Sequence, residues 1–263
     1  MRSDYPIPDY RKKFHVEEIQ YHIKCKRGDI APYVLVSGDP DRIEKIISLM
    51  SNCREVAKNR GLQTYTGFYK DIPISTCSTG MGGPSAAIVF EELINIGAKV
   101  IIRIGSMAGL QPGVKEGDTI IPFAVVRDDG VSQYYVPENF PAVADPDIYN
   151  ALCKAANSLN IHYHTGISWT HSAFYHRSNE YFQRWCRCRV ISLDMEASML
   201  FTLAYLRGIK SGMIGTCFAN RGEQTKDSQP DLHVPSIDRH IIQNGVLNSI
   251  RIALEAISFL SES

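Results

Sequence analysis

The sequence has no excess charge of either sign, because 28 lysines and arginines balance 28 aspartates and glutamates among its 263 residues. Without a broad basic field, nucleic acid and anionic membrane surfaces are not expected as partners. No apolar run approaches the roughly 18 residues that a membrane span needs, and residues 1–13 contain no apolar core of a secretory signal. We therefore expect a protein of the cytoplasm.

Cysteine is present, but its spacing matches no disulfide framework and no metal site. The seven cysteines are scattered, and the only close pair, Cys186 and Cys188, lacks zinc-ligand spacing. This distribution predicts reduced thiols and no disulfide scaffold. A hydrophobic content of 44% and a charged content of 21% are typical of a globular protein, and the length is ample for a sizeable core.

Short β-rich runs alternate with helical patterns along the chain. Strands are expected at 33–37, 62–69, 72–78, 99–105, 118–126, 161–169 and 209–219, and helices at 41–50, 85–96, 146–159, 195–207 and about 240–260. This alternation predicts an α/β fold with a largely parallel sheet. Nothing marks a linker, so we expect one domain, in which 127–145 and 221–238 are the longest stretches without a clear pattern.

Three glycine-bearing stretches lie at the ends of expected strands: "SGDPDR" (37–42), "STGMGGPS" (78–85) and "RIGSMAG" (103–109). Gly38 permits close backbone approach, and Arg42 falls in the first turn of the following helix. Arg103 stands inside an apolar strand, where it is costly unless paired or bound to a ligand, and Ser106 offers a hydroxyl. Two arginines and a hydroxyl at neighbouring strand ends indicate a phosphate site. Ordinary turns and a structural salt bridge for Arg103 remain alternatives.

Two carboxylates flank a methionine in "SLDMEAS" (192–198), where an expected strand meets an apolar helix. Asp194 has a plain alternative as a complement to the helix dipole. Glu196 would repel a phosphate nearby unless another group lay between them. A ribose would serve, because a carboxylate can accept hydrogen bonds from both vicinal hydroxyls.

Together these stretches resemble the nucleoside phosphorylases of the uridine phosphorylase and hexameric purine nucleoside phosphorylase family. The stretches that carry the resemblance are "HIKCKRGDIAPYVLVSGDPDR" (22–42), "STGMGGPS", "RIGSMAGLQPGVKEGD" (103–118), "VRDDG…FPAVAD" (126–145), "DMEAS" and "ANRGEQ". The resemblance implies a nucleoside phosphorylase domain over 22–263 after an N-terminal extension of residues 1–21. It also implies a central twisted, mixed and partly barrel-like sheet flanked by helices, in homodimers that assemble as a trimer of dimers.

The resemblance gives each candidate site residue a role. Phosphate would be bound by Gly38, Arg42, Arg103, Ser106 and, from the neighbouring subunit, Arg60. Ribose would be bound by Met195, by Glu196 through the 2′- and 3′-hydroxyls and, from across the dimer, by His22 through the 5′-hydroxyl. The base would meet Phe174, Asn220 and Arg221, and the catalytic residues would be Arg103, Glu196 and Arg221.

The reaction that the resemblance implies is phosphorolysis, in which phosphate attacks C1′ of a ribonucleoside and gives ribose 1-phosphate and free base. The arginines would place the dianion beneath C1′ and stabilise a transition state of oxocarbenium character. Inorganic phosphate is then the co-substrate, and no metal or organic cofactor is implied. Gly61 stands where some uridine phosphorylases have the glutamate of a monovalent-cation site.

The pair Asn220-Arg221 follows an apolar run directly, which by itself could be a strand end meeting water. In the hexameric purine enzymes of the family, an aspartic acid at the first position protonates the purine, and an amide cannot do so. Asparagine followed by arginine matches the uridine phosphorylases, although their uracil-binding glutamine and arginine are not matched in 176–180. Uridine is the expected substrate. A phosphorylase for 6-oxopurine or thymine nucleosides, a hydrolytic nucleosidase and a non-catalytic nucleoside-binding relative remain alternatives, as does a plain ion pair of Arg221 with Glu223.

Overall fold

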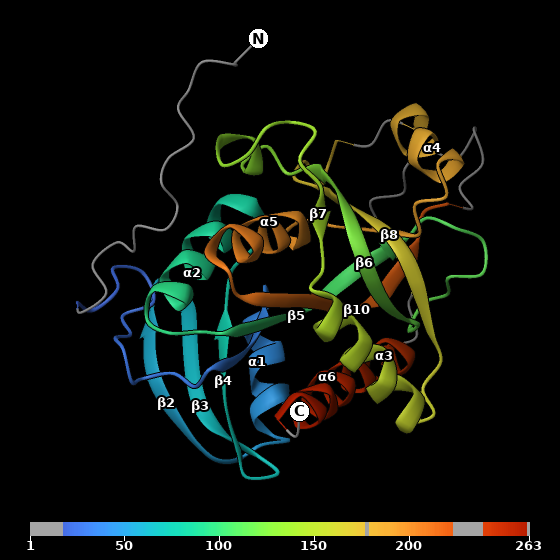
Figure 1. Ribbon diagram of the computed structural model, residues 1–263. Coiled ribbons are helices and arrows are strands. Elements are labelled where there is room, and N and C mark those ends of the chain that lie inside the picture. Colours follow the sequence, from blue (N-terminus) through green and yellow to red (C-terminus); the bar gives the residue numbers. More distant parts are fainter. Residues whose placement is uncertain (1–17, 177–178, 223–238, 262–263) are drawn as a thin grey trace.

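The computed structural model describes residues 18–176, 179–222 and 239–261 (Figure 1). The strands of this part of the chain are β1 (Tyr33–Ser37), β2 (Ser51–Asn59), β3 (Leu62–Tyr69), β4 (Ile72–Ser78), β5 (Val100–Gly109), β6 (Thr119–Asp128), β7 (Ala142–Val143), β8 (Tyr163–His171), β9 (Ser192–Asp194) and β10 (Lys210–Asn220). The helices are α1 (Pro40–Ile47), α2 (Gly83–Asn95), the 3-10 helix η1 (Ser132–Tyr134), α3 (Pro146–Ser158), α4 (Asn179–Arg187), α5 (Ala197–Arg207) and α6 (Arg239–Ser261).

The strands form one mixed sheet that is closed in one half and open in the other. Hydrogen-bonded neighbours follow the order β10-β6-β8-β9-β5-β1-β4-β3-β2, and β10 pairs in addition with β5. Strands β5, β10, β6, β8 and β9 therefore form a closed ring, and β1, β4, β3 and β2 extend from β5 as an open sheet. This arrangement confirms the expected mixed, partly barrel-like sheet.

Helices cover both faces of the sheet (Figure 1). On one face, α2 and α5 pack side by side, and their apolar residues share a core that includes Phe90, Leu93, Leu200 and Phe201. On the other face, α1, α3 and α6 contribute Ile43, Leu152 and Ile250 to a second core. The expected fold of one α/β layered unit is confirmed, and none of the helices in these described segments is long and apolar enough to cross a membrane.

Strand β5 differs from its prediction in a way that matters for the site. The apolar pattern predicted its end at Gly105, but the strand continues to Gly109 because it pairs with β10 up to Asn220 opposite Gly109. It also pairs with β9, where Ala108 lies opposite Leu193. The prediction that Ser106 follows the strand was therefore wrong, since Ser106 lies inside a strand of the closed ring.

Several elements escaped the sequence analysis because their patterns are short or polar. Strand β2 is largely exposed, β9 has only 3 residues, and α4 has only 9. Within 127–145, the structure has the end of β6, η1 and β7. Of the stretch 221–238, residues 223–238 lie outside the described residues.

The proposed boundary between residues 21 and 22 falls inside a turn that packs on α2. The backbone N–H of Gln20 donates to the carbonyl of Cys25 at 2.8 Å, and Lys24 N–H donates back to Gln20 at 3.1 Å. Asn95 Nδ2 donates to the Gln20 side chain at 3.4 Å. This turn holds His22 in a fixed position against the end of α2.

Candidate active site

The three glycine-bearing stretches meet because β1 lies between β4 and β5 in parallel pairing. Val36 is opposite Arg103, and Ser37 is opposite Ser78. The backbones beyond these strands approach closely: a Cβ atom on Gly38 would lie 3.0 Å from the carbonyl oxygen of Gly80. Gly80 itself has φ of +67°, which favours glycine. The strand-end motifs that the sequence singled out therefore form one place in the fold.

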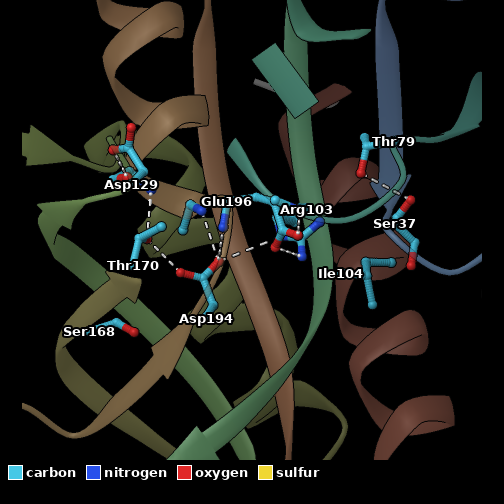
Figure 2. Close-up of polar contacts among 12 residues, drawn as sticks. Ser37, Thr79, Arg103, Ile104, Asp129, Ser168, Thr170, Asp194 and Glu196 are labelled. Atoms are coloured by element: carbon cyan, nitrogen blue, oxygen red, sulfur yellow. Dashed lines mark hydrogen bonds and ion pairs between the residues drawn. The ribbon is translucent and has the colours of Figure 1, made fainter. Parts of the chain in front are cut away.

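Arg103 is the centre of a buried charge cluster at this place (Figure 2). Its guanidinium is 4% exposed, its Nη2 donates to Glu196 Oε2, and its Nε lies 3.7 Å from Asp194 Oδ2. The salt bridge that the sequence left open therefore exists, but Nε and Nη1 have no hydrogen-bond partner. Among the described residues only six buried side-chain nitrogen or oxygen atoms are in that condition. Two buried donors of one guanidinium that lack a hydrogen-bond partner could bind an anion.

Arg42 lies next to this cluster, in the first turn of α1. Its Nη2 donates to Ser106 Oγ at 2.7 Å, and its Nη1 donates to the carbonyl of Ile104 at 3.0 Å. Burial and then the positive charge of Arg103 lower the pKa of Arg42 to about 10. Two guanidinium groups in a buried site disfavour each other, and a bound anion would relieve that repulsion. Ser106 is exposed, so the cluster reaches the surface there.

Glu196 and Asp194 supply the negative charges of the cluster. Glu196 is 3% exposed, and its Oε1 accepts the backbone N–H of Gly82 at 2.6 Å. Asp194 accepts the N–H groups of Glu196 at 3.1 Å and Ala197 at 2.8 Å and the Thr170 hydroxyl at 2.6 Å (Figure 2). Burial and then the charge of Glu196 raise the pKa of Asp194 to about 6.

Asp194 also explains where α5 begins. Its carboxylate accepts the first N–H groups of the helix, as an N-cap does, and α5 starts at Ala197 instead of the predicted residue 195. Met195 is therefore a half-buried residue of the turn, between the two carboxylates. The plain alternative for Asp194, an acidic complement to a helix start, is what the structure shows.

The side-chain amide of Asn220 forms hydrogen bonds with backbone groups of its own chain. Its Nδ2 donates to the carbonyls of Gln111 at 2.8 Å and Val114 at 2.7 Å, and its Oδ1 accepts the N–H of Gly222 at 2.7 Å. Both amide hydrogens are used inside the chain, so of this side chain only Oδ1, which already accepts one N–H, has a lone pair left for a base, and contact with a base stays a prediction. Through these hydrogen bonds Asn220 connects the loop after β5 to the end of β10. An aspartate here would lack a donor for either carbonyl.

Arg221 follows Asn220 directly, and its backbone N–H donates to the carbonyl of Gly109 at 2.7 Å. Its side chain is half-buried. The alternative partner Glu223 lies outside the described residues. Asn220 therefore fixes the point at the end of β10 from which the Arg221 side chain extends.

His22 and Arg60 lie close together on the surface. Asn59 Nδ2 donates to the backbone carbonyl of His22 at 2.7 Å. Arg60, at the turn between β2 and β3, is exposed, and its guanidinium lies 5.5 Å from the ring centroid of Tyr21. The two residues expected to act on a neighbouring subunit thus form one cluster.

This surface cluster is separated from the Arg103 cluster by most of helix α2. The N-terminus of α2 adjoins Glu196, through the N–H of Gly82, whereas His22 contacts Glu92 near the C-terminus. Glu92 lies nine residues after Gly83, which corresponds to about 13 Å along the helix. In a single chain, His22 therefore does not join the charge cluster.

Phe174 lies in the turn after β8 and is 53% exposed, with its ring perpendicular to that of Tyr175 at 5.1 Å. Residues 177–178 are outside the described part of the chain, and Glu180 is exposed in the first turn of α4. Phe174 is thus an exposed aromatic side chain in the turn that follows β8.

Asp128 anchors α4 to the sheet, a role that the sequence analysis missed. Its Oδ2 accepts Trp169 Nε1 at 3.1 Å, Tyr181 Oη at 2.7 Å and a hydrogen bond with His171 Nδ1 at 3.0 Å. Burial, and then the hydrogen bond to Asp128, raise the pKa of Tyr181 to about 12. The doubled aspartate in "VRDDG" was the only signal for this anchor, which fixes the ends of the Phe174 turn.

The fold is a partly closed mixed sheet flanked by helices, and buried arginines and carboxylates meet where its strands come together. Residues 32–257 match the phosphorylase superfamily. The chain belongs to this family, as the sequence motifs predicted.

Relatives with known names support the same family. The uridine phosphorylase of Thermococcus kodakarensis is 47% identical over 218 residues, which are 78% of this chain and 79% of that protein. A guanosine phosphorylase of Halorubrum lacusprofundi is 31% identical over 92% of this chain and 99% of its own length.

Solved structures agree with the fold. The crystal structure of Vibrio fischeri uridine phosphorylase in complex with 6-hydroxy-1-naphthoic acid superposes with a TM-score of 0.84 at 31% identity, covering 91% of this chain and 96% of that one. Purine nucleoside phosphorylase from Toxoplasma gondii in complex with immucillin-H gives a TM-score of 0.84 at 32% identity, covering 93% and 97%. The expected nucleoside phosphorylase fold is confirmed.

Proposed function

We propose that this chain is a pentosyltransferase that cleaves uridine with inorganic phosphate, giving uracil and ribose 1-phosphate for nucleoside salvage. The observation that carries the proposal is the buried Arg103, whose Nε and Nη1 have no hydrogen-bond partner, beside the buried Arg42. Phosphate is the anion that suits two guanidinium groups, because its oxygens accept paired N–H donors. Gly38 and Ser106 complete this phosphate site.

In this proposal the ribose forms hydrogen bonds with Glu196. A carboxylate has about four lone-pair positions, and Arg103 and Gly82 N–H use two of them. Two remain for the vicinal 2′- and 3′-hydroxyls. Since Arg103 binds both Glu196 and the phosphate, the attacking oxygen and the sugar are brought together by one guanidinium. Met195 borders the sugar from the same turn.

The chemical step needs only the groups of this site. A phosphate oxygen forms the bond to C1′, while the C1′–N bond breaks and its electron pair leaves with the base. Positive charge that develops on the sugar is stabilised by the bound dianion. The departing uracil carries negative charge, which Arg221 stabilises, and Phe174 packs on the base and sugar. The step requires no metal or organic cofactor.

Two observations support a homo-oligomer with shared sites. His22 and Arg60 form one surface cluster away from the chain's own Arg103, so a neighbouring subunit would present them to it. Large apolar side chains are also exposed on or beside elements that contact α5: Met81, Ile88 on α2, Tyr134 on η1 and Tyr205 on α5 itself. We propose that they line the dimer interface, in a trimer of dimers, and that the enzyme works in the cytoplasm, where its seven free cysteines stay reduced.

Uridine should be cleaved with a kcat/KM at least about a hundredfold above that for adenosine, because no acid at Asn220 can protonate a departing adenine. The measurement is base release from uridine, thymidine, guanosine, inosine and adenosine at saturating phosphate. Guanosine and inosine test the second candidate, a 6-oxopurine nucleoside, which the Halorubrum relative favours. Faster cleavage of adenosine than of uridine would refute the proposed base preference.

A further inference from the structure

The carboxylate of Glu92, near the C-terminus of α2, forms hydrogen bonds with the turn that contains His22. Glu92 is 8% exposed, and its two oxygens each lie 3.1 Å from the backbone nitrogen of His22. Its Oε2 also accepts the N–H of Ile23 at 2.9 Å, and its Oε1 lies 2.6 Å from His22 Nδ1. One buried carboxylate therefore fixes both the backbone and the ring of His22.

This contact determines which nitrogen of the imidazole carries a hydrogen. A carboxylate can only accept, so the hydrogen between the two groups belongs to Nδ1 of His22. The Nε2 atom is then the ring nitrogen left for another partner, and it acts as an acceptor in the neutral ring. Tyr21 packs edge-on against the imidazole at 4.9 Å, which limits its rotation.

The neighbouring carboxylate, Glu91, has a different partner on the same helix. It binds Arg207 of α5 through two hydrogen bonds, from Nε at 2.9 Å and from Nη2 at 2.7 Å. Glu91 thus joins two helices of one face, whereas the hydrogen bonds of Glu92 to the described residues go to His22 and Ile23. The two adjacent glutamates form a matched pair for experiments.

We propose that Glu92 is a positioning residue for the ribose 5′-hydroxyl, acting through His22. Glu92 holds the imidazole in the Nδ1–H form and directs Nε2 toward the 5′-hydroxyl of a nucleoside bound to the neighbouring subunit. This inference rests on the proposed function, in which His22 is presented to a neighbouring subunit's site, and on the contact with the 5′-hydroxyl that the family resemblance implies for His22. The carboxylate–imidazole pair works like the outer partner of a metal-bound histidine, which fixes the ring's orientation and tautomer.

The test compares uridine with 5′-deoxyuridine, which lacks only the hydroxyl in question. Glu92→Ala should lower the ratio of kcat/KM for uridine to that for 5′-deoxyuridine by about tenfold, the effect of losing one oriented hydrogen bond. His22→Ala should lower the ratio equally, and the double variant should lower it no further. The control Glu91→Ala should keep the wild-type ratio.

Amide hydrogen exchange of the segment 20–25 supplies a readout that does not depend on activity. Exchange should accelerate in Glu92→Ala and stay at the wild-type rate in Glu91→Ala. Faster exchange with an unchanged substrate ratio would overturn the positioning role and leave the proposed phosphorolysis intact, as would an equal loss on both substrates. A wild-type protein that cleaves neither nucleoside, despite the expected exchange, would refute the proposed function and this inference with it.

Discussion

Arg103→Lys should lower kcat/KM for phosphate by about two to four orders of magnitude in a protein that remains folded. Lysine keeps a positive charge beside Glu196 and Asp194, but it lacks the planar donors that Nε and Nη1 provide. Charge-assisted hydrogen bonds contribute about 1.5–3 kcal/mol each, so losing two of them gives an effect of this size. The measurement is steady-state kinetics at saturating uridine with varied phosphate.

Lysine is a better test than alanine here, because Arg103→Ala would leave two buried carboxylates without their cation. Such a loss costs about 3–5 kcal/mol of folding free energy and would confuse instability with lost binding. Arg251→Lys on the exposed side of α6 serves as the control, and thermal melting checks that both variants fold. A folded Arg103→Lys variant with wild-type phosphate kinetics would remove Arg103 from the phosphate site.

A His22→Ala/Arg60→Ala variant and a Glu196→Ala variant should each be nearly inactive alone and recover activity when mixed. In a hybrid dimer, one site combines an intact Glu196 with intact His22 and Arg60 from the other subunit. The second site lacks all three residues. Random exchange of equal amounts makes half of the dimers hybrids with one working site of two, so about a quarter of wild-type activity should return.

Native mass spectrometry on the mixture establishes whether subunits have exchanged. A variant with all three substitutions, mixed with Glu196→Ala, is the control, because none of its own sites has Glu196 and it supplies neither His22 nor Arg60. Proven hybrids without recovered activity would refute the shared site.

The charge cluster could be predicted from the sequence because its parts follow a general rule. Gly38 and Arg42 belong to a strand-to-helix turn, and Arg103 interrupts an apolar strand, where it needs a partner or a ligand. Parallel pairing of β1 with β4 and β5 then brings these stretches together. Local patterns were enough because each motif lies on a neighbouring strand.

What the sequence could not predict depends on contacts between distant segments. The length of β5 follows from closure of the ring through β10, and no pattern within 99–109 encodes that pairing. Asn220 appeared suited to a base, but its amide binds carbonyls more than a hundred positions away in the chain. Glu92 appeared to be one of two ordinary helix glutamates, and only the position of the His22 turn distinguishes it from Glu91.

The central claim is that phosphate, and not water, cleaves the nucleoside, and one measurement tests it directly. The purified protein is incubated with uridine in a phosphate-free buffer and then with added phosphate, while uracil and the sugar product are quantified together. The account predicts no uracil without phosphate and, with phosphate, equal amounts of uracil and ribose 1-phosphate. Uracil and free ribose released at the same rate in both conditions would contradict it.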